Sequence, residues 1–542
     1  MNLYQRLIPL TVASSLLLAG CNSDDSATEQ QLETSTKKNI ILMITDGASD
    51  GAWDIASFWQ HGELLNDTYP YNALDTRYAM STYALNGNSA PDTSENCDAS
   101  TYAEGFGYDP EQAASDKATD ATTFTQMQVL AYSDVTGTHE LCLNPEQGMG
   151  CSVVMYGELP ITIYANEVNL TFEAYEYINT NYTDSAASGT AFATGESTYN
   201  GAISVDNCGN TLLPITAYAK DHGLATGIVS SVQFSHATPA VFGANNTSRS
   251  NTDVIGSDLL NNGHLDLIMG SGHPLFDENG ESQEADYSYI EAQSWQSLQQ
   301  GELVSKTHQK AWTFIDSKDS FEALANQSAD EEMLSGPLIG LVQNNATLQQ
   351  SRTLCSDEDA AVAFACSYVE NVPSLATMTT GALNYLSQND KGLFVMIEGG
   401  AVDWAAHAND TARIIEEQVD FNDAVKAAYD WVEENSNWDE TLLIVTTDHG
   451  NSFVLGASSD QAVYDPVAMT AKEQMPEVKY YSGSHTNELV RFYAKGMDSE
   501  RFADYVIGKD DNYPNHYRHT GADGSYFQNK HVFNVVKDIL DQ

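Results

Sequence analysis

Four uninterrupted apolar runs constrain the fold of this chain more than any other feature of its sequence. They are rich in β-branched residues, do not alternate with polar residues, and occupy 39–45, 224–230, 393–397 and 441–446. Such strands are buried on both faces, as in a parallel sheet covered by helices. A stretch at 411–434 has apolar residues at helical spacing and is one candidate for a covering helix. We therefore predict an α/β fold: a central, mostly parallel sheet flanked by helices on both faces.

Acidic or imidazole side chains follow each of the four runs. In chain order they are Asp46, His236, Glu398, Asp448 and His449. In open α/β sheets, ligands bind beyond the carboxyl ends of the strands, so we expect these side chains to converge in space. Carboxylate and imidazole ligands together suit zinc, which makes this edge of the sheet a candidate metal site.

Three more candidate ligands lie outside the runs. Asp403 and His407 are four residues apart, so one face of a helix presents both, and His485 stands in a Ser-His-Thr-Asn motif. Any one of them is more often solvated or hydrogen-bonded than bound to a metal, but several such sets are hard to obtain by chance. Two metals about 3.5–4 Å apart would clamp the attacking and leaving oxygens of phosphoryl transfer.

The segment 183–191 carries a candidate nucleophile. Ser185 is followed by a run of small residues, which predicts a helix that begins near Ser185 and that another group can approach closely. The free N–H groups at a helix start favour an anion, phosphate above all. An ordinary serine cap on a tightly packed helix explains the segment equally well when it is taken alone. A serine hydroxyl needs a base or a metal to become nucleophilic, and no histidine is near Ser185 in sequence, so a metal is the simpler activator.

Together, these motifs resemble the alkaline phosphatase family. The blocks that carry the resemblance appear in family order and are 183–187, 236–240, 247–249, 398–404, 407–410, 447–450 and 485–490. The resemblance implies hydrolysis of small phosphate monoesters through a phosphoserine intermediate, at a site with two zinc ions and one magnesium ion. It also implies a homodimer.

The resemblance implies a role for each matched residue. Ser185 would be the nucleophile, Arg249 would grip two phosphate oxygens, and Asp184 would orient Arg249. The implied ligands are Asp403, His407 and His485 for the first zinc, Asp46, Asp448 and His449 for the second, and Asp46, Thr238 and Glu398 for magnesium. His236 and Trp404 occupy positions where some relatives carry Asp and Lys. We expect His236 either to hydrogen-bond beside the third ion or to bind it directly; the alternative is that it only packs against Trp404.

The N-terminal segment predicts export. Arg6 precedes an apolar stretch at 7–18, and small residues lead directly to Cys21. This pattern resembles a bacterial lipoprotein signal, in which residues 1–20 are removed and Cys21 is lipidated; a plain secretory signal is the alternative. Residues 21–38 are polar and fit a tether. We therefore expect the protein on the periplasmic or cell-surface side of a bacterial membrane, anchored through Cys21.

The remaining six cysteines predict disulfides, because an even set in an exported chain is typical of them. Nearness in sequence favours two pairs and leaves a third, although six cysteines allow 15 connectivities. The favoured pairs are Cys142–Cys151 and Cys355–Cys366, leaving Cys97–Cys208.

Residues 39–542 are interpreted as one catalytic domain with surface insertions. The insertions are expected near 85–165, 276–327 and 456–479, where polar residues interrupt the strand and helix rhythm. A separate small domain at 85–165 is the alternative for the first. Three C-terminal histidines match no implied ligand and are expected at the surface: His516, His519 and His531.

The charge of the chain excludes some partners. A net charge of −53 disfavours nucleic acids and anionic membrane surfaces, which bind proteins through clustered Lys and Arg.

Two alternative functions are suggested by other features of the sequence. Residues 47–51 match the G-x-S-x-G motif of serine esterases, with Ser49 as the nucleophile. An acidic lipoprotein that binds cations without turnover is the second rival.

Overall fold

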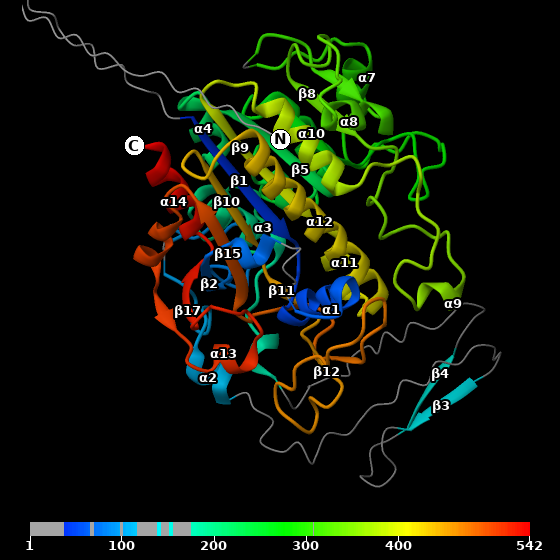
Figure 1. Cartoon of the computed structure of the whole chain (residues 1–542), viewed down its shortest axis with the longest axis vertical. Helices are drawn as coiled ribbons and strands as arrows, with labels where there is room; N and C mark the ends of the chain where they lie inside the picture. The colour runs from blue at the N-terminus through cyan, green and yellow to red at the C-terminus, as the bar shows by residue number, and fades with distance from the viewer. Residues whose placement is uncertain are drawn as a thin grey trace, which may run out of the picture. The chain divides into compact units, whose positions relative to one another are not determined.

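An 11-stranded sheet forms the centre of the computed structural model, which describes residues 37–64, 70–97, 101–115, 138–142, 151–155, 175–306 and 308–542 (Figure 1). In spatial order its strands are β16 (Gly508–Lys509), β17 (Ser525–Gln528), β2 (Thr76–Ser81), β15 (Val490–Gly496), β10 (Thr441–Thr446), β1 (Lys38–Thr45), β9 (Gly392–Gly399), β5 (Ala225–Gln233), β6 (Leu267–Ser271), β8 (Leu338–Leu341) and β7 (Thr313–Ile315). The strands from β10 to β7 are all parallel, and β15 runs antiparallel to both of its neighbours. The predicted, mostly parallel α/β sheet is therefore confirmed.

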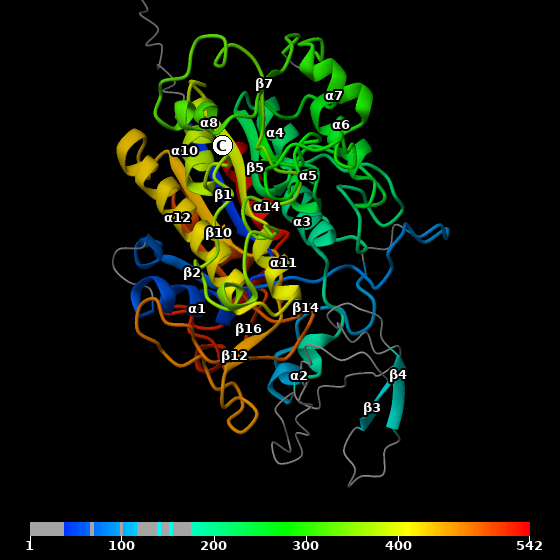
Figure 2. The same cartoon turned by 90° about the vertical axis from the view of Figure 1, so that its right-hand side faces the viewer.

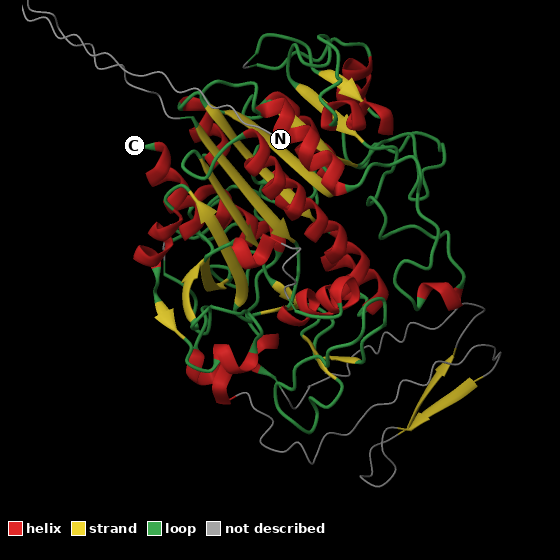
Figure 3. Cartoon of the chain, in the orientation of Figure 1, coloured by secondary structure: helices red, strands yellow, loops and turns green. Residues whose placement is uncertain are grey.

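Strand β1 shows why the apolar runs do not alternate with polar residues. Ile41 and Met43 lie in the core on one face of the sheet, whereas Ile40, Leu42 and Ile44 lie in the core on the other. The helices of the first face are α1 (Asp50–His61), α8 (Lys318–Ala325), α10 (Leu375–Leu386) and α12 (Thr411–Asn435). Those of the second are α3 (Ser185–Thr194), α4 (Ile215–Asp221), α6 (Thr252–Asn261), α7 (Ala292–Gln299) and α14 (His531–Leu540), and both layers are visible in Figures 2 and 3. The expected helix at 411–434 corresponds to α12.

The remaining helices and strands are shorter. The helices are α2 (Pro110–Ser115), α5 (Ala237–Ala240), α9 (Asp357–Ala360), α11 (Ala401–His407) and α13 (Tyr513–His516); the strands are β3 (Thr138–Cys142), β4 (Cys151–Met155), β11 (Gly450–Asn451), β12 (Val454–Gly456), β13 (Val478–Tyr480) and β14 (His485–Thr486). No helix in the described ranges combines the length and apolar character needed to span a bilayer.

The three expected insertions differ in how far they stand apart from the sheet. The stretch 276–327 contains α7, β7 and α8, and β7 is an edge strand of the main sheet, so this stretch is partly integral to the fold. The stretch 456–479 includes the start of β13, which pairs with β12 in a small separate sheet. Much of 85–165, like the signal and most of the tether, lies outside the described residues.

Two of the three expected disulfides are present, namely Cys97–Cys208 and Cys355–Cys366. The third pair falls on Cys142 and Cys151, whose side chains lie outside the described part of the chain, although β3 and β4 pair these two residues in register. A Cβ added at Gly209, the residue after Cys208, would lie 3.3 Å from the side chain of Thr247.

We expect titration of the unfolded, unreduced mature protein to find no free thiol, because all six cysteines beyond Cys21 would be paired. Reduction should destabilise the protein by roughly 2–5 kcal/mol per native bridge, which chemical denaturation would measure. An engineered Cys97→Ser/Cys208→Ser protein is the matched control for the first bridge. Several reactive thiols in the unreduced wild type would contradict the disulfide framework.

Candidate functional site

The ends of three neighbouring strands bring the predicted acids together. Ile44 of β1 lies opposite Glu398 of β9 on one side and Thr446 of β10 on the other. Asp46 and Asp448 each follow two residues later, so they leave the sheet at the same edge as Glu398. Gly47 makes this convergence sterically feasible: its φ is +67°, and a Cβ there would lie 2.4 Å from a carboxylate oxygen of Asp403.

The first candidate metal group contains Asp403, His407 and His485, whose ligand atoms lie within 4.8 Å of one another. The Nε2 atoms of both histidines lie 3.4 Å from carboxylate oxygens of Asp403 and 3.1 Å from each other. Burial opposes ionisation of Asp403, but the hydrogen bonds from the two histidines hold its pKa well below the usual range. Asp403 and His407 come from α11, as their four-residue spacing predicted, and His485 comes from β14.

The second group contains Asp46, Asp448 and His449, all fully buried. His449 Nε2 lies 3.2 Å from Asp448 Oδ2 and 3.6 Å from Asp46 Oδ1. The other carboxylate oxygen of Asp448 accepts hydrogen bonds from the N–H groups of Gly47 and His449. Oδ2 is left facing the group without a hydrogen-bond donor in the described chain.

The third group contains Asp46, His236 and Glu398. Thr238, the residue expected beside Asp46 and Glu398, is fully buried and contributes a hydroxyl without a hydrogen-bond partner in the described chain. Both oxygens of Asp46, Oε1 of Glu398 and Nδ1 of His236 are likewise buried and unpartnered there. Unpartnered buried polar atoms are costly, so this donor set fits a bound cation.

Backbone carbonyls fix the orientation of the three histidines in the first two groups. The Nδ1 atoms of His485, His407 and His449 lie 2.8, 3.3 and 3.3 Å from the carbonyl oxygens of Thr183, Gly483 and Gly450, respectively. Each ring therefore directs Nε2 towards the carboxylates. This arrangement sets the tautomer and is typical of histidines that bind metals through Nε2.

Ser185 is the first residue of α3 and is almost completely buried, with Oγ 3.3 Å from His449 Nε2. Asp184 caps the helix by accepting a hydrogen bond from the Ala187 N–H. Its other oxygen lies 3.0 Å from Nη1 of Arg249, while Nη2 of Arg249 lies 3.2 Å from His236 Nε2. The serine, the arginine and the candidate metal groups therefore form one continuous site.

Burial raises the pKa values of three acids in this site, namely Asp46, Glu398 and Asp448, in contrast to that of Asp403. Burial, and then repulsion by Asp448, raises the pKa of Asp46 well above its ordinary value. Burial raises the pKa of Glu398 to about 8 and that of Asp448 to about 7, and it lowers the pKa of His236 to about 3. Neutral imidazole and carboxylates that lack counter-charge are the groups that a bound cation would stabilise.

Several supporting residues had no signal in the sequence. Asn451 donates a 2.7 Å hydrogen bond to Asp403, Ser230 donates to Glu398, and Ser188 donates to the backbone oxygen of Asp448. Each is a common polar residue, and its role depends on the tertiary contact alone. Trp404, an expected neighbour, lies edge-on to His236 at 5.9 Å between ring centroids.

Other sequence candidates lie elsewhere or in different surroundings. Ser49, the esterase candidate, is buried and accepts a hydrogen bond from the Val454 N–H, with no histidine bonded to it in the described chain. The surface prediction was wrong for His519, which is 3% exposed and lies 3.1 Å from the hydroxyl of Tyr513. His516 and His531 are half-buried.

Known proteins resemble this chain in sequence and in fold. A family model described as alkaline phosphatase matches residues 163–528. Alkaline phosphatase 4 of Bacillus subtilis is 32% identical over 323 residues, covering 58% of this chain but only 60% of that protein's own length. The alkaline phosphatase of Escherichia coli is 30% identical over 346 residues, covering 58% of this chain and 69% of that protein. The structure of the alkaline phosphatase from the Antarctic bacterium TAB5 matches with a TM-score of 0.52 and 18% identity, covering 93% of this chain and 99% of that one.

Proposed function

Because this chain belongs to the alkaline phosphatase family, we propose that it hydrolyses phosphate monoesters through a phosphoserine formed at Ser185. The observation that carries this proposal is that Ser185, Arg249 and three groups of acids and histidines lie together in one site. A metal-binding protein without turnover would not need a serine and an arginine there.

We propose two zinc ions and one magnesium ion as cofactors. Asp403, His407 and His485 would hold the first zinc; Asp46, Asp448 and His449 the second; and Asp46, Thr238 and Glu398 the magnesium, with His236 beside it. The mixed nitrogen and oxygen donors of the first two groups favour zinc, and the oxygens of the third favour a hard ion. When bound, such ions supply Lewis-acid stabilisation of the phosphoryl and attacking oxygens.

The chain's own residues account for the two displacements. In the first, the Ser185 hydroxyl loses its proton and its oxygen forms a bond to phosphorus, while the bond from phosphorus to the ester oxygen breaks and that oxygen takes up a proton as the alcohol. In the second, water loses a proton and forms a bond to phosphorus, while the bond from phosphorus to the Ser185 oxygen breaks; that oxygen takes up a proton and inorganic phosphate is released. The N–H groups at the start of α3 and the Arg249 guanidinium would hold the phosphate oxygens during both steps, while Asp184 keeps Arg249 in position.

Rates on a monoester and a diester test this reaction class. We expect the purified protein to hydrolyse p-nitrophenyl phosphate much faster than bis(p-nitrophenyl) phosphate. A monoester has three non-bridging oxygens, so two can pair with Arg249 while the third remains for the candidate metal groups, whereas a diester has only two. A protein that prefers the diester would contradict the proposal.

Arg249→Lys should weaken both substrate and inorganic phosphate binding. Lysine cannot form two parallel hydrogen bonds to phosphate, and it would also lose the geometry of the 3.0 Å pair with Asp184. We expect a loss of roughly 1–3 kcal/mol, or about 5- to 150-fold in the inhibition constant of inorganic phosphate. Arg501→Lys, at an arginine far along the chain with its own Asp498 partner, is the matched control. An unchanged inhibition constant in Arg249→Lys would exclude this residue from the site.

His236→Asp should increase magnesium affinity. The imidazole is half-buried, and desolvation lowers its pKa to about 3, so it is neutral; an aspartate there would add an oxygen and a negative charge beside Asp46 and Glu398. We expect a lower magnesium midpoint and greater stimulation of the rate than in wild type, measured by titrating metal-depleted protein. Equal midpoints and equal stimulation would show that His236 only packs against Trp404.

We also propose that the protein is exported and anchored by lipid on Cys21, on the periplasmic or cell-surface side of a bacterial membrane, and that it forms a homodimer. The apolar stretch that ends in small residues and Cys21 supports the anchor. Mass spectrometry of the mature N-terminus, with Cys21→Ser as the control, tests lipidation; light scattering tests the dimer. A mature N-terminus without lipid would leave only the secretory alternative.

A further inference from the structure

A cavity of about 470 Å³ lies beside α12, and none of the residues that line it belongs to the proposed metal or phosphate site. Its walls combine apolar side chains, among them Phe364 and Val419, with the acids Glu417, Asp420 and Asp423 of α12. Its volume lies within the range of pockets that bind small organic molecules, which also combine apolar walls with a few polar groups.

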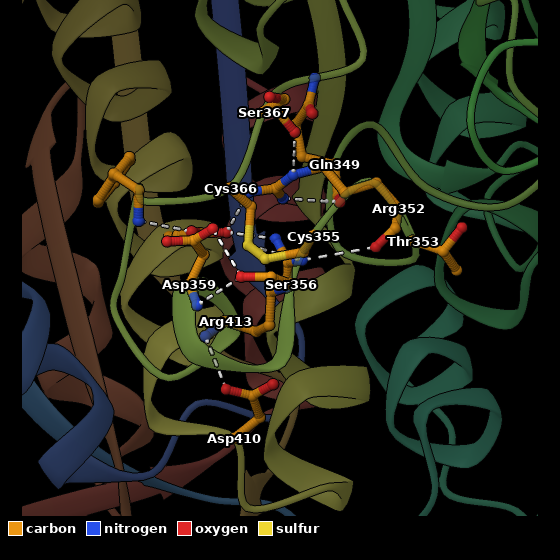
Figure 4. The surroundings of a disulfide bond; sticks show 12 residues. Gln349, Arg352, Thr353, Cys355, Ser356, Asp359, Cys366, Ser367, Asp410 and Arg413 are labelled. Atoms are coloured by element: carbon orange, nitrogen blue, oxygen red, sulfur yellow. Dashed lines mark hydrogen bonds and ion pairs between the residues drawn. A yellow bond between two sulfur atoms is a disulfide. The ribbon is translucent and has the colours of Figure 1, made fainter.

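The two arginines near the cavity form ion pairs and hydrogen bonds with groups other than Glu417 and Asp420. Arg352 and Arg413 both bind Glu416, at 2.9 and 2.7 Å, and both are buried beside the Cys355–Cys366 disulfide (Figure 4). Within the described part of the chain, the other hydrogen bonds of the two guanidinium groups go to backbone oxygens and to the sulfur of Cys366. Lys318, which also lines the cavity, donates to the backbone oxygen of Glu370.

Glu417 is the unpartnered group in this cavity. Its side chain is 4% exposed, and in the described part of the chain it makes no hydrogen bond or ion pair. Asp420, one helical turn away, accepts a single, long hydrogen bond of 3.4 Å from the Leu375 N–H among the residues that the structure describes. Burial raises the pKa of Glu417 to about 8 and that of Asp420 to about 7. A buried carboxylate without a partner is costly, so this arrangement favours a positively charged occupant.

We propose that the cavity binds a small organic ammonium compound. Its ammonium group would lie between Glu417 and Asp420, and its hydrocarbon part would pack against Phe364 and Val419. Phe364 is held in place by stacking on Trp59, at 5.8 Å between ring centroids, and by its N–H bond to Glu416. An aromatic wall next to carboxylates suits a cation that also has an apolar part.

A bare divalent metal ion fits this cavity less well. In the described chain, the sets of three or more acid and histidine ligand atoms within 4.8 Å of one another all belong to the proposed metal centre, and none includes Glu417 or Asp420. Calcium and magnesium need six or more oxygens close to the ion. The volume of the cavity is also far larger than one ion requires.

Calorimetric titration with phenethylamine tests the proposal, using the full mature protein without substrate so that the result does not depend on phosphatase activity. The titration is done at about pH 8.5, where an alkylammonium is protonated. We expect saturable binding of one phenethylammonium per chain, and binding of 2-phenylethanol, its neutral counterpart, at least about tenfold weaker. Glu417→Gln and, independently, Asp420→Asn should each weaken amine binding about tenfold or more.

Glu434→Gln, at an exposed glutamate of the same helix, is the matched control and should bind the amine like wild type. Glu417→Gln removes a buried, unpartnered charge, so it should fold, with a thermal midpoint no lower than that of wild type. The proposal is overturned if the amine does not bind, if 2-phenylethanol binds equally well, or if both cavity variants bind like wild type. Displacement of the amine by calcium chloride in a Glu417-dependent manner would instead identify a metal site.

Discussion

Replacing Ser185 by alanine is expected to lower the hydrolysis of p-nitrophenyl phosphate at least about 10³-fold, because the covalent step then has no nucleophile. Ser185 is the first residue of α3, and its Oγ lies 3.3 Å from His449 Nε2, so the substitution removes one oxygen and leaves the helix and the candidate ligands in place. Steady-state rates on the purified variant measure the loss. Elemental analysis should find the same metal content as in wild type.

Ser49→Ala is the control for this substitution. Ser49 is as deeply buried as Ser185, but its Oγ accepts a hydrogen bond from the Val454 N–H and faces no histidine among the described residues. We expect this variant to keep near wild-type phosphatase activity. Full activity in Ser185→Ala together with inactivity in Ser49→Ala would favour an esterase-type nucleophile at the 47–51 motif.

Removal of the metals with a chelator should abolish phosphatase activity and also make stability depend on pH. In the metal-free protein, burial raises the pKa of Asp448 to about 7 and that of Glu398 to about 8, above their values in the unfolded chain. The native state therefore binds more protons, so stability falls as pH rises from about 4 to 8. We expect the thermal midpoint of the chelated protein to be roughly 5 °C lower at pH 9 than at pH 6.

Restoring zinc and magnesium should recover the activity and reduce this pH dependence, because bound cations stabilise the ionised carboxylates. Hydrolysis of p-nitrophenyl acetate is the control, since a serine esterase would retain it without metal. Phosphatase activity that survives exhaustive chelation would contradict the proposed metal site.

The sheet and much of the site could be predicted because strong local patterns encode them. Continuous apolar runs are typical of buried parallel strands, and the parallel register then carries Asp46, Glu398 and Asp448 to one edge. Asp403 and His407 likewise lie four residues apart in one helix, α11, as their spacing predicted. In each case a short segment contains the pattern that predicts its structure, and the order of the strands in the sheet then brings the segments together.

Features that depend on contacts distant in sequence could not be predicted. Strand β7 has only three residues, too few for a periodic pattern, so its place at the edge of the main sheet has no signal within 276–327. His519 is an ordinary histidine in a polar stretch, and its burial depends on Tyr513 and on Tyr493, whose ring lies 4.5 Å from it between centroids. The unpartnered state of Glu417 is also a tertiary property, because its neighbour Glu416 takes both arginines.

Trapping of the covalent intermediate tests the central claim most directly. The protein would be mixed with a phosphate monoester, quenched in acid and digested, and its peptides examined by mass spectrometry. The account predicts phosphate on the peptide that contains Ser185, at the start of α3, and none in Ser185→Ala. Phosphate on another residue, or turnover of the monoester with no phosphopeptide under any quench condition, would contradict it.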